Sequence, residues 1–147
     1  MTNFVEVTGG NKFQRDIAHK TIAFMIKKLM PRMKTLDITV KLTNPNGAMG
    51  YCLELDDNRS FEIEADKKLR LRKLLETIAH EMVHVKQYAR RELHPVHNTW
   101  CGKTYNPKTT DYWDLPWEIE AHGREVGLFV RWAEKYKLGN KKWTQDV

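Results

Sequence analysis

The sequence contains few cysteines and no long apolar run. Two cysteines among 147 residues, Cys52 and Cys101, are too few for a disulfide framework, and no Cys and His cluster has zinc-finger spacing. No stretch approaches the ~20 apolar residues of a membrane span, and residues 1–7 lack the basic and apolar regions of a leader. We therefore expect a soluble cytoplasmic protein with reduced thiols and no membrane partner.

The chain also lacks internal repeats, low-complexity tracts and linkers that would divide domains. We expect one domain over residues 1–140, followed by a polar, frayed tail at residues 141–147. The formal charge of +6 permits attraction to nucleic acid or to acidic substrates. Because the basic residues are dispersed and form no nucleic-acid-binding motif, a solvated surface is the simpler interpretation.

Hydrophobic periodicity predicts an α+β domain with a small antiparallel or mixed sheet of about three strands, backed by helices. A helix over residues 12–29 is followed by alternating segments at 36–42, 49–55 and 59–65, which we interpret as an antiparallel meander. Asp66 is a suitable N-cap for a long helix over residues 67–91. An irregular loop or small hairpin should follow at residues 92–116, before a last helix over residues 117–137.

The long helix contains the segment His80-Glu81-Met82-Val83-His84. Two histidines four residues apart project from one helical face and can bind a single zinc ion. The adjacent Glu81 is then expected to accept a proton from a zinc-activated water and to deliver it to the leaving amine. On a helical wheel the histidines flank the apolar stripe, while Arg72, Lys86 and Arg90 lie on the side predicted to face solvent.

A catalytic zinc usually has three protein ligands, so a third is expected downstream. The candidates are His94, His97, Glu118, Glu120 and His122. On the last helix Glu118 shares the apolar face, whereas Glu120 lies on the opposite side, where Arg124 can pair with it. An inward carboxylate is costly unless it is paired or bound to metal, which favours Glu118. His122, one turn later, is placed to orient that carboxylate, and an ordinary half-buried histidine is its alternative interpretation.

This combination of motifs resembles the gluzincin metallopeptidases. His80-Glu-Met-Val-His84 is followed after 33 residues by Glu118-Ile-Glu-Ala121, and residues 112–125 resemble small metallopeptidases of a minimal gluzincin type, some of them phage-encoded. The resemblance implies a zincin-like fold, one Zn²⁺ per chain, hydrolysis of peptides or unfolded proteins, and a host-cytoplasm location for a phage protein. It also implies that the strand at residues 59–65 is a sheet edge that aligns substrate. His122 stands where larger gluzincins often have Asp.

A second resemblance is to SprT/Spartan-like peptidases, in which His97 would be the third ligand and protein attached to DNA the substrate. That arrangement leaves the inward Glu118 unexplained. A transition-state donor could come from Tyr105, Tyr112, His97 or His122. The alternative functions are a non-catalytic zinc module that binds protein or nucleic acid, and a zinc amidase with a non-protein substrate.

Overall fold

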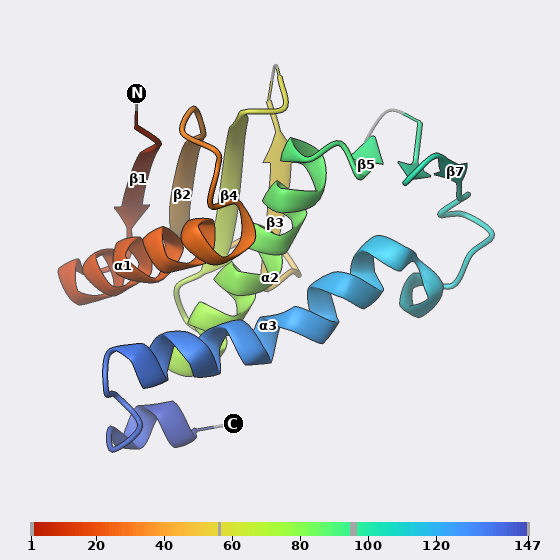
Figure 1. Ribbon diagram of the computed structural model, residues 1–147. Coiled ribbons are helices and arrows are strands. Elements are labelled where there is room, and N and C mark those ends of the chain that lie inside the picture. Colours follow the sequence, from red (N-terminus) through yellow and green to blue (C-terminus); the bar gives the residue numbers. More distant parts are fainter. Residues whose placement is uncertain (1, 56, 95–96, 147) are drawn as a thin grey trace.

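The computed structural model describes residues 2–55, 57–94 and 97–146, and it has the α+β architecture that the sequence predicts (Figure 1). The main elements are β1 (Phe4–Gly9), α1 (Lys12–Leu29), β2 (Asp37–Thr43), β3 (Gly50–Glu54), β4 (Ser60–Asp66), α2 (Leu71–Ala89) and α3 (Pro116–Lys135). The smaller ones are β5 (Leu93–His94), β6 (Thr99–Trp100), β7 (Lys103–Thr104) and the 3-10 helices η1 (Tyr112–Asp114) and η2 (Lys142–Gln145). Helix α1 has the predicted bounds.

The main sheet is mixed and has the strand order β1-β2-β4-β3. Strands β1, β2 and β4 are parallel, and β3 is antiparallel to β4. The predicted meander is therefore wrong, because β4 lies between β2 and β3, and β1 is a fourth strand that the sequence analysis missed. The expectation that residues 59–65 form a sheet edge is also wrong. The edge on this side is β3.

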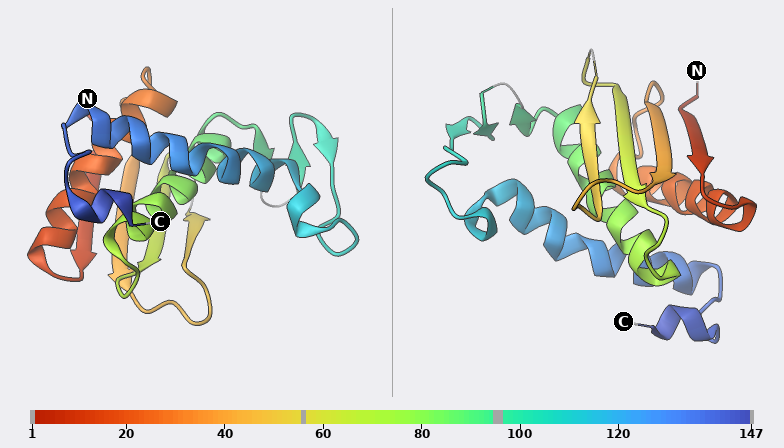
Figure 2. Two further views of the ribbon diagram at one scale, coloured as in Figure 1. Left: turned by 90° about the horizontal axis from the view of Figure 1, so that it is seen from below. Right: turned by 180° about the vertical axis from the view of Figure 1, so that it is seen from behind.

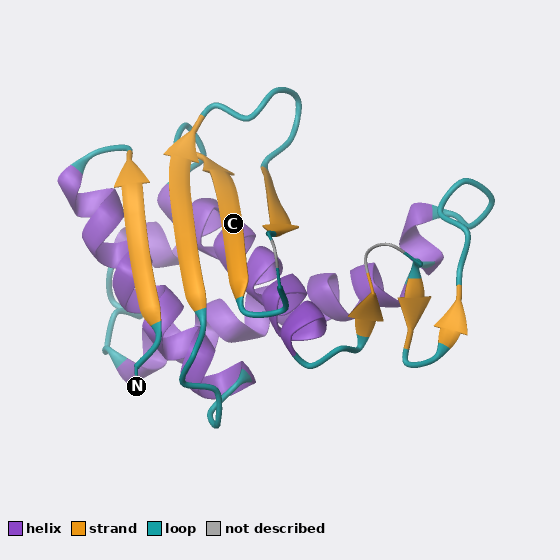
Figure 3. Cartoon of the chain, turned by 90° about the horizontal axis from the view of Figure 1, so that it is seen from above, coloured by secondary structure: helices purple, strands orange, loops and turns teal. Residues whose placement is uncertain are grey.

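Helices cover one face of the sheet (Figure 3). The other face carries polar side chains of β2 and β4. In β2 and β4 every second residue is buried, which is the pattern of strands with one apolar face. The buried members are Ile38, Val40, Leu42, Phe61, Ile63 and Ala65. On the polar face Lys41 pairs with Glu62 at 2.8 Å.

Helix α2 is the centre of the molecule, since it contacts β3, β4, α1, α3 and η2. Its residues from Leu74 to Gln87 are all buried. The helix begins later than predicted because Asp66 caps a turn instead: its carboxylate accepts from the Lys68 amide, and the Lys67 amide donates to Thr43 at the end of β2. Arg70 is the N-cap of α2 and makes no side-chain capping bond.

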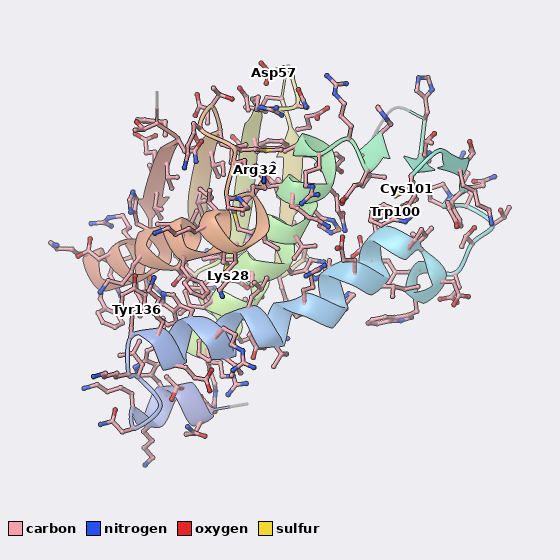
Figure 4. The ribbon with its side chains drawn as sticks, viewed as in Figure 1. Lys28, Arg32, Asp57, Trp100, Cys101 and Tyr136 are labelled. Atoms are coloured by element: carbon pink, nitrogen blue, oxygen red, sulfur yellow. The ribbon has the colours of Figure 1, made fainter. Side chains whose placement is uncertain are left out.

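The described part of residues 93–115, which we call the arm, lies to one side of the main sheet (Figures 1 and 3). It contains the small antiparallel sheet β5-β6-β7 and η1. Leu93, Leu115 and Trp117 form a second small core, against which Trp100 and Tyr105 pack. Trp100, labelled in Figure 4, thus lies beside the beginning of α3.

The C-terminal segment is packed rather than frayed, contrary to expectation. Helix η2 lies beneath α2 and α3 (Figure 2), with Thr144 buried and Trp143 in contact with the core. Arg72 donates to the Thr144 carbonyl at 2.6 Å, and Arg70 pairs with Asp146 at 2.8 Å. Arg72 is thereby largely withdrawn from the solvent side predicted for it. Over the part of the chain that the structure describes, no helix combines the length and apolarity needed to span a membrane.

Candidate metal centre

The site is formed where the middle of α2 packs against the first half of α3. His80, Glu81 and His84 of α2 are all less than 10% exposed. Helix α3 contributes Glu118 from its first turn and His122 from its second. The structure therefore brings together the residues that the sequence analysis assigned to zinc and its base.

The two histidines and Glu118 have the spacing of a metal-binding triad. His80 Nε2 lies 3.1 Å from Glu118 Oε1, and His84 Nε2 lies 3.4 Å from Glu118 Oε2. Tetrahedral zinc with N and O ligands at about 2.0–2.2 Å separates neighbouring ligand atoms by about 3.4 Å. The candidate ligand atoms all lie within 4.8 Å of one another. Donor type and spacing both fit Zn²⁺.

Hydrogen bonds to the far side of each imidazole fix which nitrogen faces Glu118. His84 Nδ1 lies 2.7 Å from Gln87 Oε1, and His80 Nδ1 lies 3.4 Å from Glu125 Oε1. Amide and carboxylate oxygens accept, so both Nδ1 atoms donate, and Nε2 is the nitrogen available to a metal. Such an arrangement orients metal-binding histidines.

Gln87 is fully buried, and its amide orientation is determined by its neighbours. Its Nε2 donates to the Trp117 carbonyl at 2.9 Å and to Glu120 Oε1 at 3.0 Å, which leaves Oε1 to accept from His84. The sequence analysis did not identify this role. A glutamine three residues after a motif histidine, on the same helix, is the signal that could have shown it.

Glu125 is the second residue that the sequence analysis missed. Its carboxylate accepts from His122 Nδ1 at 2.6 Å and makes the longer contact with His80. Glu125 follows Glu118 by seven residues, almost exactly two helical turns, so the helical wheel places both on one face. His122, four residues after Glu118, lies 4.0 Å from that carboxylate. Its hydrogen bonds connect it to the candidate ligands in two ways: Nδ1 bonds to Glu125, which contacts His80, and Nε2 lies 2.9 Å from the Tyr112 hydroxyl, which donates to Glu118.

His80, His122 and Glu125 form a second group that could hold a cation, since each offers one ligand atom within 4.8 Å of the others. Within this group His80 Nδ1 already contacts Glu125. A metal there would compete with the hydrogen bonds that orient His80. The first triad leaves those bonds intact and is the better site.

The charges of the cluster are strongly coupled. Burial disfavours the charged form of His80, but hydrogen bonds to Glu118 and Glu125 outweigh it and raise the pKa to about 9. Burial acts against ionisation of Glu118, yet hydrogen bonds from both histidines bring its pKa well below the ordinary value. The half-buried Glu118 carboxylate thus favours positive charge on the histidines beside it, as the carboxylate of a cation site does.

Glu81 differs from Glu118 in its surroundings. Burial raises its pKa, with the neighbouring histidines opposing the change. A carboxylate with a raised pKa is better matched to general acid and base work near neutral pH. Gly50 of β3 lies close by: a Cβ placed on it would be 3.5 Å from Glu81 Oε2 and 2.9 Å from Thr77. The absence of a side chain at Gly50 lets β3 approach α2 beside Glu81.

A cleft of about 660 Å³ opens beside His80, Glu81 and His122. Tyr112 lies on its wall and its hydroxyl is 2.9 Å from both Glu118 Oε1 and His122 Nε2. Two of the four candidate transition-state donors, Tyr112 and His122, therefore lie in the cleft. Tyr105 does not, because it packs edge-on against Trp117 in the second core.

The remaining candidates lie apart from the triad. His97 is exposed in a turn of the arm, and neither it nor His94 belongs to a metal-binding group of the described residues. Glu120 binds Lys86 at 2.5 Å and Arg124 at 2.9 Å, so it pairs with Arg124 as predicted. The prediction that Lys86 faces solvent is wrong: Lys86 is 6% exposed and pairs with Glu92 as well.

Comparison with known proteins identifies no relative. No protein-family model, no curated protein and no solved structure matches the chain. The function is therefore argued from the site itself.

Proposed function

We propose that this protein is a zinc-dependent metallopeptidase of the gluzincin type. The observation that carries the proposal is the convergence of His80 Nε2, His84 Nε2 and Glu118, with both Nδ1 atoms already bonded to acceptors. Three protein ligands of this kind are typical of catalytic rather than structural zinc, which usually has four. The proposed cofactor is one Zn²⁺ per chain.

When bound, zinc would supply Lewis acidity for the attack of water on a carbonyl group. The residues of the chain then divide the remaining work. Glu81 accepts the proton of the attacking water and passes it to the leaving amine, and its burial tunes it for both transfers. Tyr112 and His122 lie in the same cleft and are the donors proposed for the oxyanion.

The proposed substrate is an extended segment of a peptide or unfolded protein. Strand β3 forms the sheet edge next to β4, and its residue Gly50 lines the cleft beside Glu81. A peptide in extended conformation can pair with such an edge through its backbone, largely independent of sequence. We therefore assign the alignment of substrate to β3, and not to residues 59–65, which form an internal strand.

The proposal also includes a cytoplasmic location, or the host cytoplasm for a phage-encoded protein. The thiols of Cys52 and Cys101 are free, which suits a reducing compartment.

The test compares the wild type with Glu81→Gln, each loaded with zinc and incubated with a complex peptide mixture. We expect the wild type to cleave peptides. Glu81→Gln should bind one zinc per chain and lose at least about 10²-fold in hydrolysis, since it lacks the base but keeps the ligands. Glu134→Gln, at an exposed position on α3, is the matched control and should remain fully active. Equal cleavage by Glu81→Gln would exclude the proposed role, and cleavage by neither protein would exclude the peptidase function.

A further inference from the structure

The cleft contains one cationic side chain outside the cluster already described. Lys73, in the first turn of α2, lines the cleft on the side away from His84, and its side chain is 44% exposed. No other lysine or arginine lines the cleft as the described residues form it. The acidic residues that line it are Glu76, Glu81 and Glu125.

Lys73 has no close acidic partner among these residues. Its Nζ lies 4.0 Å from Glu76 Oε1, at the limit of an ion pair, whereas the other oxygen of Glu76 binds Arg72 at 2.9 Å. Glu125 is bonded to His122. Glu76 thus pairs mainly with Arg72, which is closer and less exposed than Lys73. The first turn of α2 carries no acidic residue. The ammonium group of Lys73 is left to interact with an anion that enters the cleft.

The position of Lys73 relative to Glu81 sets the place of such an anion along a bound peptide. Eight residues of helix separate their Cα atoms by about 12 Å. An extended peptide covers that distance in about four residues. The side chain of Lys73 and the acidic side chain of the substrate reach toward each other, which reduces the number of residues needed. An acidic group on the substrate would therefore lie within about three residues of the cleaved bond, always on the same side.

Part of the cleft wall is apolar. Trp113, Met49 and Val126 all line it and are 66%, 49% and 46% exposed. A polar contact between partly desolvated groups is stronger than one in open water. The formal charge of +6 on the whole chain further favours the approach of an acidic peptide.

We propose that the cleft selects peptide segments that carry an Asp or Glu side chain, or a C-terminal carboxylate, within about three residues of the cleaved bond on one side, with Lys73 as the residue that binds it. This inference rests on the proposed peptidase function and defines its substrate class. Lys73 contacts the substrate and has no part in proton transfer.

The test is to sequence the products that the zinc-loaded enzyme releases from a complex peptide mixture, then to measure kcat/KM on matched synthetic peptides with Glu or Gln at the selected position. For the wild type we expect Asp and Glu to be enriched on one side of the cleaved bond. Lys73→Met should lose about tenfold in kcat/KM on the Glu peptide and less than about twofold on the Gln peptide. Lys73→Glu should prefer a peptide with Lys at that position. Lys27→Met removes the same charge from the exposed surface of α1 and should keep the wild-type preference.

The outcomes separate this inference from the function on which it rests. Cleavage by the wild type without any acidic preference would overturn the role of Lys73 and leave the peptidase function intact. Retention of the acidic preference in Lys73→Met would do the same. Absence of cleavage by the wild type would overturn both. A C-terminal carboxylate as the ligand would appear as cleavage confined to the last few residues of each peptide, abolished by amidation.

Discussion

Replacement of Glu125 tests whether the environment of the ligands, and not only the ligands, determines zinc affinity. Glu125 is 9% exposed, accepts from His122 Nδ1 at 2.6 Å and contacts His80 Nδ1 at 3.4 Å. Glu125→Gln keeps the size of the side chain but removes the negative charge. Loss of a partner that orients a metal-binding histidine typically reduces metal affinity by about 10- to 100-fold.

The geometry places the expected effect at the lower end of that range. The contact with His80 is long, so it contributes less than a short hydrogen bond, and we expect Glu125→Gln to weaken zinc binding about tenfold, or about 1.4 kcal/mol. Glu125→Ala should weaken it further, because His80 and His122 both lose their acceptor. Competition for zinc with a chromophoric chelator at constant pH measures the change. Glu134→Gln is the control for loss of a carboxylate on α3. Affinities of both Glu125 variants within about twofold of the wild type would refute the reasoning.

Three further predictions concern the packing of the chain and the exclusion of His97 as a ligand. Gly50→Ala should lower the free energy of unfolding by about 1–3 kcal/mol and reduce hydrolysis, because its Cβ would lie 2.9 Å from Thr77 Cγ2. The control Gly139→Ala, with open space around it, should be neutral. Equal denaturation midpoints for the two variants would contradict the clash at Gly50. His97→Ala should leave zinc content unchanged, and zinc loss measured by elemental analysis would restore His97 as a ligand. Trp143→Ala should destabilise the protein by about 2 kcal/mol in urea unfolding, whereas a frayed tail would give no change.

The sequence predicts the helical part of the site well. The placement of His80 and His84 on one face follows from their spacing alone, because the helical repeat determines which residues share a face. The orientation of Glu118 follows from the same repeat and agrees with its contacts to both histidines. The same repeat places Glu125 on the face of Glu118, although it lies outside the motif from which the site was predicted.

The order of the strands in the sheet does not follow from the sequence pattern. Alternation identifies β2, β3 and β4 as strands but carries no information on which neighbour each one pairs with. Strand β4 separates β2 from β3, and this order makes β3 the edge beside Glu81. Strand β1 has only Val5 and Val7 as its inward-facing apolar residues, and two residues are too short an alternation to predict a strand.

Long-range polar contacts explain the other differences. The helical wheel predicts that Lys86 of α2 faces solvent. In the structure Lys86 is buried, because its ammonium group pairs with Glu92 and Glu120. Two contacts hold the polar C-terminal segment. Arg72, which is distant in sequence, donates to the Thr144 carbonyl, and Trp143, a single aromatic residue among polar neighbours, packs against the core. Local composition does not report such partners.

Zinc content is the most direct test of the central claim that His80, His84 and Glu118 hold a catalytic zinc ion. Elemental analysis of the purified, zinc-loaded protein after dialysis should give one zinc per chain for the wild type and for Glu134→Ala, at an exposed position on α3. Glu118→Ala, on the same helix, should retain little zinc while circular dichroism shows it folded. Full zinc retention in Glu118→Ala, or no zinc in the wild type, would contradict the account.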